Sequence, residues 1–416
     1  MSTTEATRPR ESARRPVPVG TVAPDYELVA PLDPDPAGLL AAIGDDDRAH
    51  HARARDFVEN DVLPVIADYW DRSDYPLHLV RRAGELDLLR DGIAVPGLPP
   101  MSKLAAGLIT MEVSRGDGSM ATVIAVQGGL AMRSIDLLGS DAQKQRWLDP
   151  LARGLEFGAF ALTEPTHGSD SVSLETTAHT DGDEVILTGH KKWIGNGSVG
   201  GVTVVWARGD DGQVHGYLVD QATPGYTGRT IERKSALRAI WQAEIELDGV
   251  RVPASHQLPG GASFADTSRV LLATRLGVAW SALGHATACY ETAVHYARQR
   301  IQFGRPLAAS QIVQERLARM LSELATMQLL CFRMSELDEA GTLTGTQASL
   351  AKYTCTRTAR GIAANARDLL GGNGILLDNR VARHMADLEA IHTYEGTETM
   401  QALIIGRSIT GVSAFV

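Results

Sequence analysis

The spacing of hydrophobic residues changes twice along the chain. From about Asp45 to Phe160 apolar residues recur every three or four positions, which predicts amphipathic helices. From Ala161 to about Leu258 the period falls to two, and turn residues separate short runs, which predicts strands. From about Asp266 the helical spacing returns. The expected fold is therefore mainly α with a central β domain.

The same pattern gives the individual elements and the domain limits. We expect short strands of a small barrel or sandwich at Glu184 to Thr188, Val202 to Ala207, Gly216 to Val219 and Ala243 to Leu247. We expect helices at Arg55 to Trp70, Asp141 to Leu151, Leu271 to Arg300, Leu307 to Ala340, Thr346 to Leu370 and Thr399 to Thr410. The domains are then 37–160 (helical), 161–265 (β) and 266–416 (a helical bundle), after a disordered tail at 1–36 that is rich in arginine and proline.

Composition narrows the class of protein. The 416 residues are 44% hydrophobic and carry a net charge of −10, so a large core is expected, and nucleic acid is not expected as a principal partner. No segment has the ~20 apolar residues of a membrane span. Cys289, Cys331 and Cys355 are widely spaced within expected helices, which predicts buried thiols, no disulfide and no metal site. This cysteine pattern suits a reducing compartment, and we expect a cytoplasmic location.

Two local features lie in the β domain. The segment Ala161 to Asp170 clusters hydroxyls, glycine and proline where helix gives way to strand, and could present backbone amides to the edge of a planar ring. An ordinary capped connection is the alternative. In Lys191 to Gly197 a tryptophan stands between two lysines and a glycine turn, and could form a wall beside a flat cofactor. Taken alone, this segment is also consistent with a hairpin that has a buried aromatic residue.

Two further features lie in the C-terminal helices. Arg300, before a Gly-Arg-Pro turn, is either a cation at a helix end or a phosphate clamp. The glycines of Leu370 to Ile375 permit close backbone approach, but no strand precedes them, so they do not form a Rossmann motif. Glu395 follows a tyrosine and precedes a glycine just before the last helix. It is either a functional carboxylate or a helix cap, and Glu398 is a candidate for the second role.

Together the four features resemble, in order and spacing, the acyl-CoA dehydrogenase family, and the resemblance extends from about Asp45 to Phe415. The Leu-Thr-Glu-Pro…Gly-Ser-Asp element resembles its first signature. The stretch from Gly371 to Asp387 resembles its second, with Asp368 where Gln or Glu is usual. The final stretch is similar to glutaryl-CoA dehydrogenases and plant short-chain acyl-CoA oxidases. The resemblance implies a helical domain, a β domain and a four-helix domain, assembled as a homotetramer.

The resemblance also implies the reaction. An acyl-CoA is oxidised to its trans-2-enoyl form, Glu395 removes the α-proton, and the flavin of FAD takes the β-hydride. A carboxylate can remove this weakly acidic proton if the thioester carbonyl is hydrogen-bonded, which stabilises the developing enolate. By analogy, the backbone N–H of Glu395 helps to polarise that carbonyl together with a ribityl hydroxyl of the flavin.

The binding residues follow from matched positions in the family. The FAD contacts implied are Leu162, Thr163, Ser169, Trp193, Ile194, Gly195, Arg300, Gln311, Asp368, Leu369, Leu370, Gly371, Gly372, Thr397 and Phe415, with Arg300 and Gln311 reaching the FAD of a neighbouring subunit. The substrate contacts implied are Ser169, Ser268, Arg275, Gly396 and Ala121. Gly195 stands where Ser or Thr is usual, so one hydroxyl contact to the flavin is missing.

The substrate and the electron acceptor are less determined. Glutaryl-CoA dehydrogenases hold the distal carboxylate with an arginine where this chain has Ala121, and Ser114 replaces a companion glutamate. Because a buried carboxylate needs a cation, glutaryl-CoA is disfavoured unless Arg115 or Arg133 substitutes. The acceptor is expected to be an electron-transfer flavoprotein, and a short-chain oxidase that reduces oxygen is the alternative. A glutaryl-CoA dehydrogenase and an inactive FAD- or CoA-binding protein also remain open, although Glu395 argues against the latter.

Overall fold

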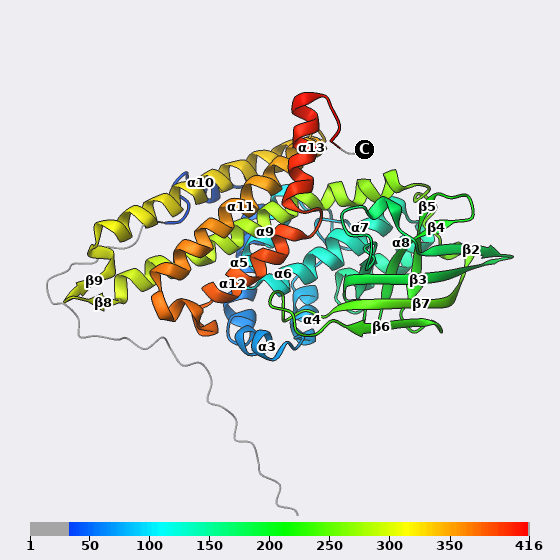
Figure 1. Ribbon diagram of the computed structural model, residues 1–416, viewed down its shortest axis with the longest axis horizontal. Helices are drawn as coiled ribbons and strands as arrows, with labels where there is room; N and C mark the ends of the chain where they lie inside the picture. Colours follow the sequence, from blue (N-terminus) through cyan, green and yellow to red (C-terminus); the bar gives the residue numbers. More distant parts are fainter. Residues whose placement is uncertain (1–32, 415–416) are drawn as a thin grey trace, which may run out of the picture.

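Within the described part of the chain, helices precede and follow one central mixed sheet (Figure 1). The computed structural model describes residues 33–414. The predicted tail lies outside the described residues over positions 1–32, as does Phe415. The order of helical domain, β domain and helical bundle confirms the predicted fold class.

The N-terminal domain is built from short helices around a buried centre. Its elements are α1 (Leu39–Ala42), α2 (Asp45–Phe57), the π-helical η1 (Val58–Val62), α3 (Ile66–Arg72), α4 (Leu77–Glu85), α5 (Lys103–Gly116), α6 (Gly118–Ile124), the π-helical η2 (Ala125–Met132), α7 (Arg133–Leu138) and α8 (Asp141–Ala152). The helix expected over Arg55 to Trp70 is divided, because Pro64 has no N–H to continue the helical ladder and Leu63 N–H bonds back to Val58 O.

One helical stretch of this domain is long and apolar enough to cross a membrane. Among the described residues, Gly118–Leu138 meets that test by length and composition alone. Of its most hydropathic window, 72% is buried inside the protein. The stretch is therefore accounted for as a core helix, which is the usual origin of such a run in a folded domain.

The β domain is a seven-stranded mixed sheet. Its strands are β1 (Gly158–Ala161), β2 (Thr177–Asp181), β3 (Glu184–Gly195), β4 (Val202–Gly209), β5 (Val214–Asp220), β6 (Tyr226–Thr230) and β7 (Gln242–Pro253). The order is β1-β4-β2-β3-β7-β6, with β5 on β4, and β1 and β2 run parallel to β4. All four expected strands are present and longer than expected. β1, β2 and β6 were not expected. The four residues of β1 are all buried and show no alternation, whereas β2 has one buried residue and β6 has none.

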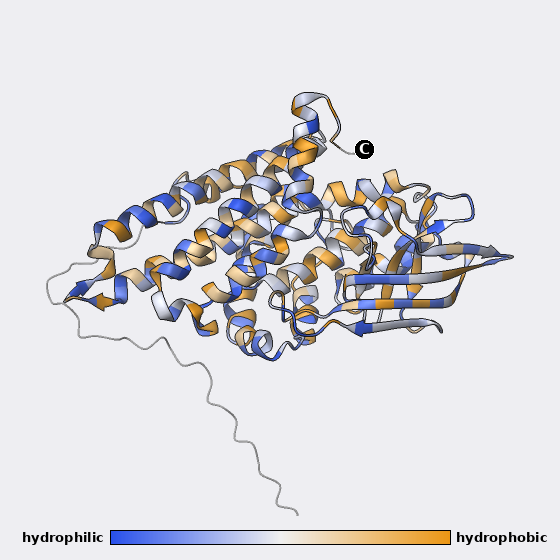
Figure 2. Ribbon diagram, in the orientation of Figure 1, coloured by the Kyte–Doolittle hydropathy of each residue, from blue (hydrophilic) through white to orange (hydrophobic). Residues whose placement is uncertain are grey.

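The C-terminal domain consists of long antiparallel helices. They are α9 (Phe264–Gln299), α10 (Gln311–Glu339), α11 (Gly345–Leu369), α12 (Val381–Thr393) and α13 (Glu398–Thr410), with a small hairpin of β8 (Ile301–Gln302) and β9 (Arg305–Pro306) after α9. Hydrophobic and hydrophilic positions alternate along these helices as a buried face requires (Figure 2). The three cysteines are free and buried in this core, as predicted. α13 projects from the body of the molecule (Figure 1).

Candidate active site

A pocket lies where the N-terminal helices pack against α9, beside the turn that joins α12 to α13. Small side chains, hydroxyl groups and two carboxylates surround it. The lining residues are Asp91, Thr110, Ala121, Ile124, Ala125, Gly129, Ala273, Thr274, Gly277, Val278, Ser281, Tyr394 and Glu395. The pocket therefore contains Glu395 and Ala121, two of the residues expected from the sequence to meet the substrate.

Glu395 is held in an unusual backbone conformation. Its φ is 52° and that of Gly396 is 85°, so two consecutive residues lie in the left-handed region. A side chain at Gly396 would also meet Gln401 Nε2 at 2.7 Å, so only glycine fits. Thr397 caps α13 by accepting from the Met400 N–H. Because that cap is filled, Glu395 is not needed as a helix cap, and its strained turn presents the carboxylate to the pocket.

The carboxylate of Glu395 is placed by a hydrogen bond and tuned by its surroundings. The Thr274 hydroxyl on α9 donates to Glu395 Oε2 at 2.9 Å. Burial raises the pKa of Glu395 above its usual value, the charges of Lys352 and Arg275 oppose that rise, and Asp91 adds to it. A carboxyl group with a raised pKa is suited to accepting a proton from a weak carbon acid.

The other two candidate acids are engaged elsewhere. Glu398 forms an ion pair with Arg357 at 2.6 Å and also contacts His392 Nε2 at 2.9 Å. Glu164 is buried, and its Oε1 accepts from the buried Lys191 Nζ at 2.8 Å. Neither carboxylate lines the pocket, so Glu395 is the acid that the geometry favours as a base.

The β domain brings its predicted cofactor segments together. Lys191 Nζ donates to Leu162 O at 3.1 Å, and the Lys192 N–H donates to Thr163 O at 2.9 Å, which joins the signature loop to β3. The pairing of β3 with β7 slips between Lys191 and Ile194, and Trp193 there has a φ of 66°. Its indole is 53% exposed. The bulge thus turns a large flat side chain outward beside the loop, whereas Ile194 stays buried.

Gly195 connects this strand end to the pocket. A β-carbon at Gly195 would lie 2.9 Å from Val126 Cγ2, closer than side chains normally approach. Val126 belongs to η2, whose Ala125 and Gly129 line the pocket. The absence of the family's usual hydroxyl residue at this position therefore has a steric reason.

A second pocket lies at the far end of the C-terminal bundle. It is lined by Tyr296, Arg300, Gln302, Leu307, Asp368, Leu369, Leu370, Gly371, Gly372 and Asn373. The fold thus brings Arg300 next to the segment Asp368 to Asn373, which contains the glycines. Asp368, the first residue of this segment, lies 68 positions after Arg300 in the sequence. Within residues 33–414 no hydrogen bond or ion pair engages the Arg300 guanidinium. Gln311, exposed at the start of α10, does not line this pocket.

The remaining expected contacts are dispersed. Ser169 is exposed in the signature loop. Ser268 is exposed near the start of α9, where its hydroxyl donates to Phe264 O. Arg275, one turn beyond Leu271 on α9, donates to Ser349 Oγ at 3.0 Å, and its charge acts on Glu395. Arg275 is therefore close to the first pocket, whereas Ser169 and Ser268 are surface positions.

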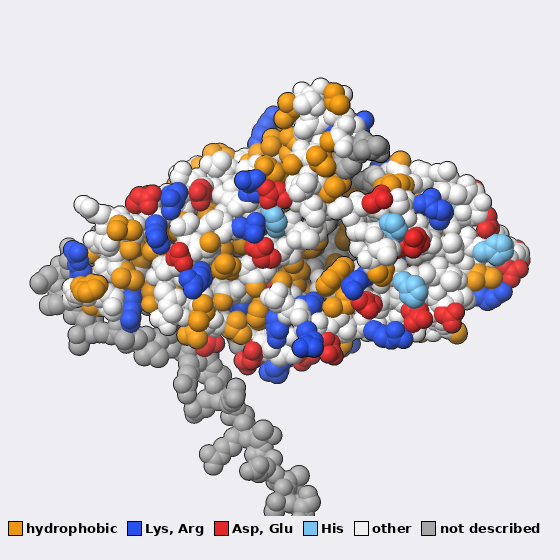
Figure 3. Space-filling model, viewed as in Figure 1, with side chains coloured by type: hydrophobic (Ala, Val, Ile, Leu, Met, Phe, Trp, Pro, Cys, Tyr) orange, Lys and Arg blue, Asp and Glu red, His pale blue; other side chains and the backbone are white. Residues whose placement is uncertain are grey.

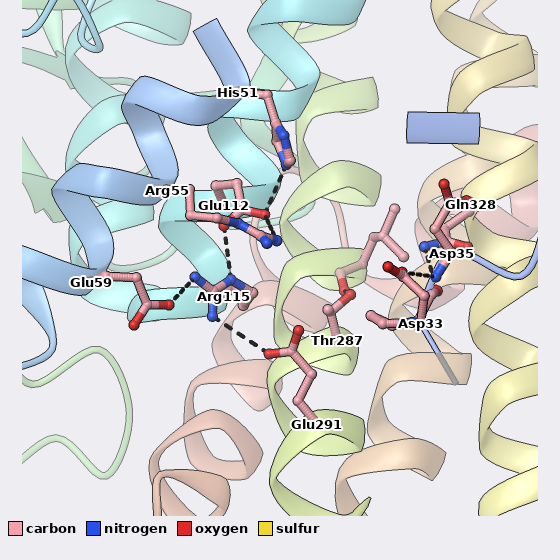
Figure 4. Close-up of polar contacts among 12 residues, drawn as sticks. Asp33, Asp35, His51, Arg55, Glu59, Glu112, Arg115, Thr287, Glu291 and Gln328 are labelled. Atoms are coloured by element: carbon pink, nitrogen blue, oxygen red, sulfur yellow. Dashed lines mark hydrogen bonds and ion pairs between the residues drawn. The ribbon is translucent and has the colours of Figure 1, made fainter. Parts of the chain in front are cut away.

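Arg115 and Arg133 are the two arginines that could bind a distal carboxylate of the substrate, and neither is free. Figure 4 shows Arg115 among the carboxylates of Glu59, Glu112 and Glu291, and each of them pairs with its guanidinium. Arg133 Nη2 pairs with Asp91 Oδ2 at 3.0 Å. Both cations are thus already neutralised by the protein's own acids.

Sequence reasoning missed several residues that shape the site. Thr274, Gln401 and Lys352 all hold the Glu395 turn or its carboxylate, and Asp91 faces it from the loop after α4. Only Lys352 left a signal in the sequence, as a lone lysine among the small apolar residues of an amphipathic run. Thr274, Gln401 and Asp91 are polar residues of kinds that are common on protein surfaces, and their role depends on how the chain packs.

Comparison with known families covers nearly the whole described chain. Family models match for the acyl-CoA dehydrogenase N-terminal domain over residues 44–155, the middle domain over 159–250 and the C-terminal domain over 261–410. These ranges follow the three structural domains.

Individual relatives agree with these matches. The mitochondrial short-chain specific acyl-CoA dehydrogenase of Rattus norvegicus is 33% identical over 360 residues, covering 84% of this chain and 87% of the relative. The crystal structure of a glutaryl-CoA dehydrogenase from Mycobacterium smegmatis is 42% identical with a TM-score of 0.89, covering 91% of this chain and 98% of that one. A second glutaryl-CoA dehydrogenase structure from M. smegmatis, in complex with FADH2, is 38% identical with a TM-score of 0.88, covering 90% and 97%.

Proposed function

The chain belongs to the acyl-CoA dehydrogenase family, and we propose that it oxidises a short-chain acyl-CoA to trans-2-enoyl-CoA with Glu395 as the base. One observation carries this proposal. Glu395 lies in a small pocket, is oriented by Thr274, and has a pKa that burial raises. The strained turn at Glu395 and Gly396 serves no capping need, so its cost is explained by function.

The residues act on the α-carbon of the thioester. Glu395 accepts the α-proton on its carboxylate, while Thr274 keeps that carboxylate in one orientation. By analogy with the family, the Glu395 N–H donates to the thioester oxygen and stabilises the charge that develops there. FAD, the cofactor of the family, supplies the acceptor for the β-hydride when it is bound.

The described residues fit FAD at both of its ends. Trp193 is exposed, and the signature loop is fixed to its strand through Leu162 O and Thr163 O, so the indole could cover the ring while the loop meets its edge. Arg300, which has no partner among residues 33–414, lies with Asp368–Gly372 in the second pocket and could pair with phosphate. Because this pocket lies at the far end of the bundle, we infer that it serves the FAD of a neighbouring subunit.

The acyl chain is proposed to be short and uncharged. The pocket is walled by Ala121, Ala125 and Ala273, and its acidic residues are Asp91 and Glu395. A distal carboxylate would meet two acids and no free cation, and burying it unpaired is costly. Glutaryl-CoA is therefore disfavoured, although glutaryl-CoA dehydrogenases are among the similar structures.

A homotetramer is proposed as the assembly. Large hydrophobic side chains are exposed on the C-terminal domain, including Phe303, Ile312 and Ile409, which are 101%, 69% and 78% exposed. In Figure 3, hydrophobic side chains lie between mixed acidic and basic ones over the helical end and on the projecting α13. Such surfaces are typical of contacts between copies. We propose an electron-transfer flavoprotein as the acceptor, by the family relation.

The test is anaerobic mixing of the FAD-loaded protein with butyryl-, isobutyryl-, hexanoyl- and glutaryl-CoA while the flavin absorbance is followed. We expect butyryl-CoA to bleach the flavin faster than glutaryl-CoA does. Glu395→Gln should keep FAD and bind ligand but bleach at least ~10²–10⁴-fold more slowly, because Gln cannot accept the proton. Glu398→Gln, three residues away, is the matched control and should bleach at close to the wild-type rate.

Three outcomes would contradict parts of the proposal. If no acyl-CoA bleaches the wild-type flavin, the activity is wrong; if Glu395→Gln bleaches as fast as Glu398→Gln, the base is wrong. Efficient conversion of glutaryl-CoA to crotonyl-CoA would refute the substrate class alone. Admitting air after reduction distinguishes the acceptors, since rapid reoxidation with turnover would favour oxygen over an electron-transfer flavoprotein.

A further inference from the structure

We propose that Lys352 is a positioning residue for the catalytic carboxylate: its buried ammonium holds the two carbonyls on either side of Glu395 and keeps that carboxylate ionised. The inference rests on the proposed role of Glu395 as the base. It concerns a residue on α11, whereas Glu395 lies on the turn between α12 and α13. The Lys352 side chain and the turn at Glu395 are brought together only by the fold.

Lys352 joins two carbonyls that bracket the base. Its Nζ donates to Tyr394 O and to Gly396 O, and the residue is completely buried. Gln401 Nε2 donates to Glu395 O at 3.1 Å and to Gly396 O at 3.0 Å. The three consecutive carbonyls of the left-handed turn are therefore held by one cation and one amide, which offsets the strain of the turn.

A buried ammonium needs more than carbonyl partners to stay charged. Among residues 33–414 no carboxylate lies within ion-pair distance of Lys352. The opposite charge that acts on it is Glu395, and Arg275 on α9 acts against it. Burial lowers the pKa of Lys352 to about 8, with Glu395 opposing that shift.

The charge of Lys352 acts on Glu395 in turn. Of the charges that favour the ionised form of Glu395, Lys352 is the largest, ahead of Arg275, whereas Asp91 disfavours it. Arg275 is itself turned towards Ser349, and Asp91 is paired with Arg133. Lys352 is thus the cation that faces the catalytic turn directly, and its loss should leave Glu395 protonated at higher pH.

A merely structural lysine would behave differently, and the chain contains one for comparison. Lys234 is also partly buried, donates to Leu237 O and Ile240 O at 2.7 Å each, and has its pKa lowered to about 8 by burial. It supports backbone carbonyls next to β7, and Asp387 rather than Glu395 is the acid acting on it. Lys234→Met is therefore the matched control for loss of a buried ammonium.

The experiment compares Lys352→Met with Lys234→Met and Gln401→Leu in the FAD-loaded protein. Infrared difference spectra follow the protonated carboxylic acid band that is absent in Glu395→Gln, across a pH titration. Anaerobic bleaching by butyryl-CoA is measured over the same range. Lys352→Met should move both midpoints upward by about one pH unit or more. Gln401→Leu should slow bleaching without moving the midpoint, and Lys234→Met should move neither.

The outcomes separate this inference from the proposed function. Unchanged midpoints in folded Lys352→Met would overturn it and make Lys352 structural only. If Lys352→Met does not fold, Lys352→Gln, which keeps a neutral donor, should show the same shift, and an unshifted midpoint there overturns the inference equally. If no acyl-CoA bleaches the wild type, the proposed function fails, while the infrared titration still reports whether Lys352 controls Glu395.

Discussion

Replacing Gly195 by serine would restore the hydroxyl that the family usually has at this position, and we predict that it destabilises the protein. The new β-carbon would lie 2.9 Å from Val126 Cγ2 and 3.6 Å from Ile240 Cδ1. Val126 is buried on η2, and a β-branched side chain has few rotamers in a helix, so it cannot turn aside freely. The strand or the helix must shift instead.

The size of the effect follows from this contact. Overpacking a core typically costs about 1–3 kcal/mol, which corresponds to a fall in the melting temperature of roughly 1–3 °C for a chain of 416 residues. Val126→Ala removes the contact but leaves a gap, and the lost apolar burial should destabilise the protein by about 1–2 kcal/mol. Gly195→Ser combined with Val126→Ala should therefore be more stable than the sum of the two single losses, since each change compensates the other.

The assay is thermal unfolding of the FAD-loaded variants, with the ratio of FAD to protein measured after purification. Gly195→Ser alone should unfold earlier and retain less FAD, and the double variant should recover much of both. Gly361→Ser is the control, because a β-carbon there meets no atom within 4 Å. A single variant as stable and as rich in FAD as the wild type would show that Val126 yields without cost and would refute the steric explanation.

Two further predictions concern charge. Arg300→Ala should weaken FAD binding by roughly 10- to 100-fold, as expected for loss of a charge-assisted bond, without changing the order of acyl-CoA preference. Equilibrium dialysis with FAD measures this affinity. An unchanged affinity would mean that Arg300 is only a solvated cation at a helix end. His285 and His384 are buried with their Nδ1 atoms 2.8 Å apart, and burial lowers both pKa values, that of His285 to about 3. The unfolded chain takes up these protons below about pH 6.5 and the folded chain does not, so stability should fall by about 2 kcal/mol per histidine between pH 7 and pH 5. Denaturant unfolding should show a weaker pH dependence in His285→Gln/His384→Gln, and an identical dependence would contradict the assignment.

The sequence alone determined the domain order and several helix limits. Hydrophobic period reports which face of a local segment is buried, so α8, α11 and α13 were predicted to within about two residues of their observed ends. The pattern failed where burial is not periodic. α12 was not predicted, because Arg383 and Asp387 lie on its buried side and pair or bond with distant groups instead of following an apolar stripe.

Motif spacing also singled out Glu395 and Trp193, because a tight turn and a bulge are encoded by neighbouring residues. Only the tertiary structure decided what surrounds them. Thr274 reaches Glu395 across 121 positions of sequence, and Lys352 reaches the same turn from another helix. Whether Arg133 could serve a substrate depended on Asp91, which folds against it from another segment. Short-range patterns report local conformation, whereas the charge and space around a side chain are set by whichever distant segments pack there, and these decide its chemistry.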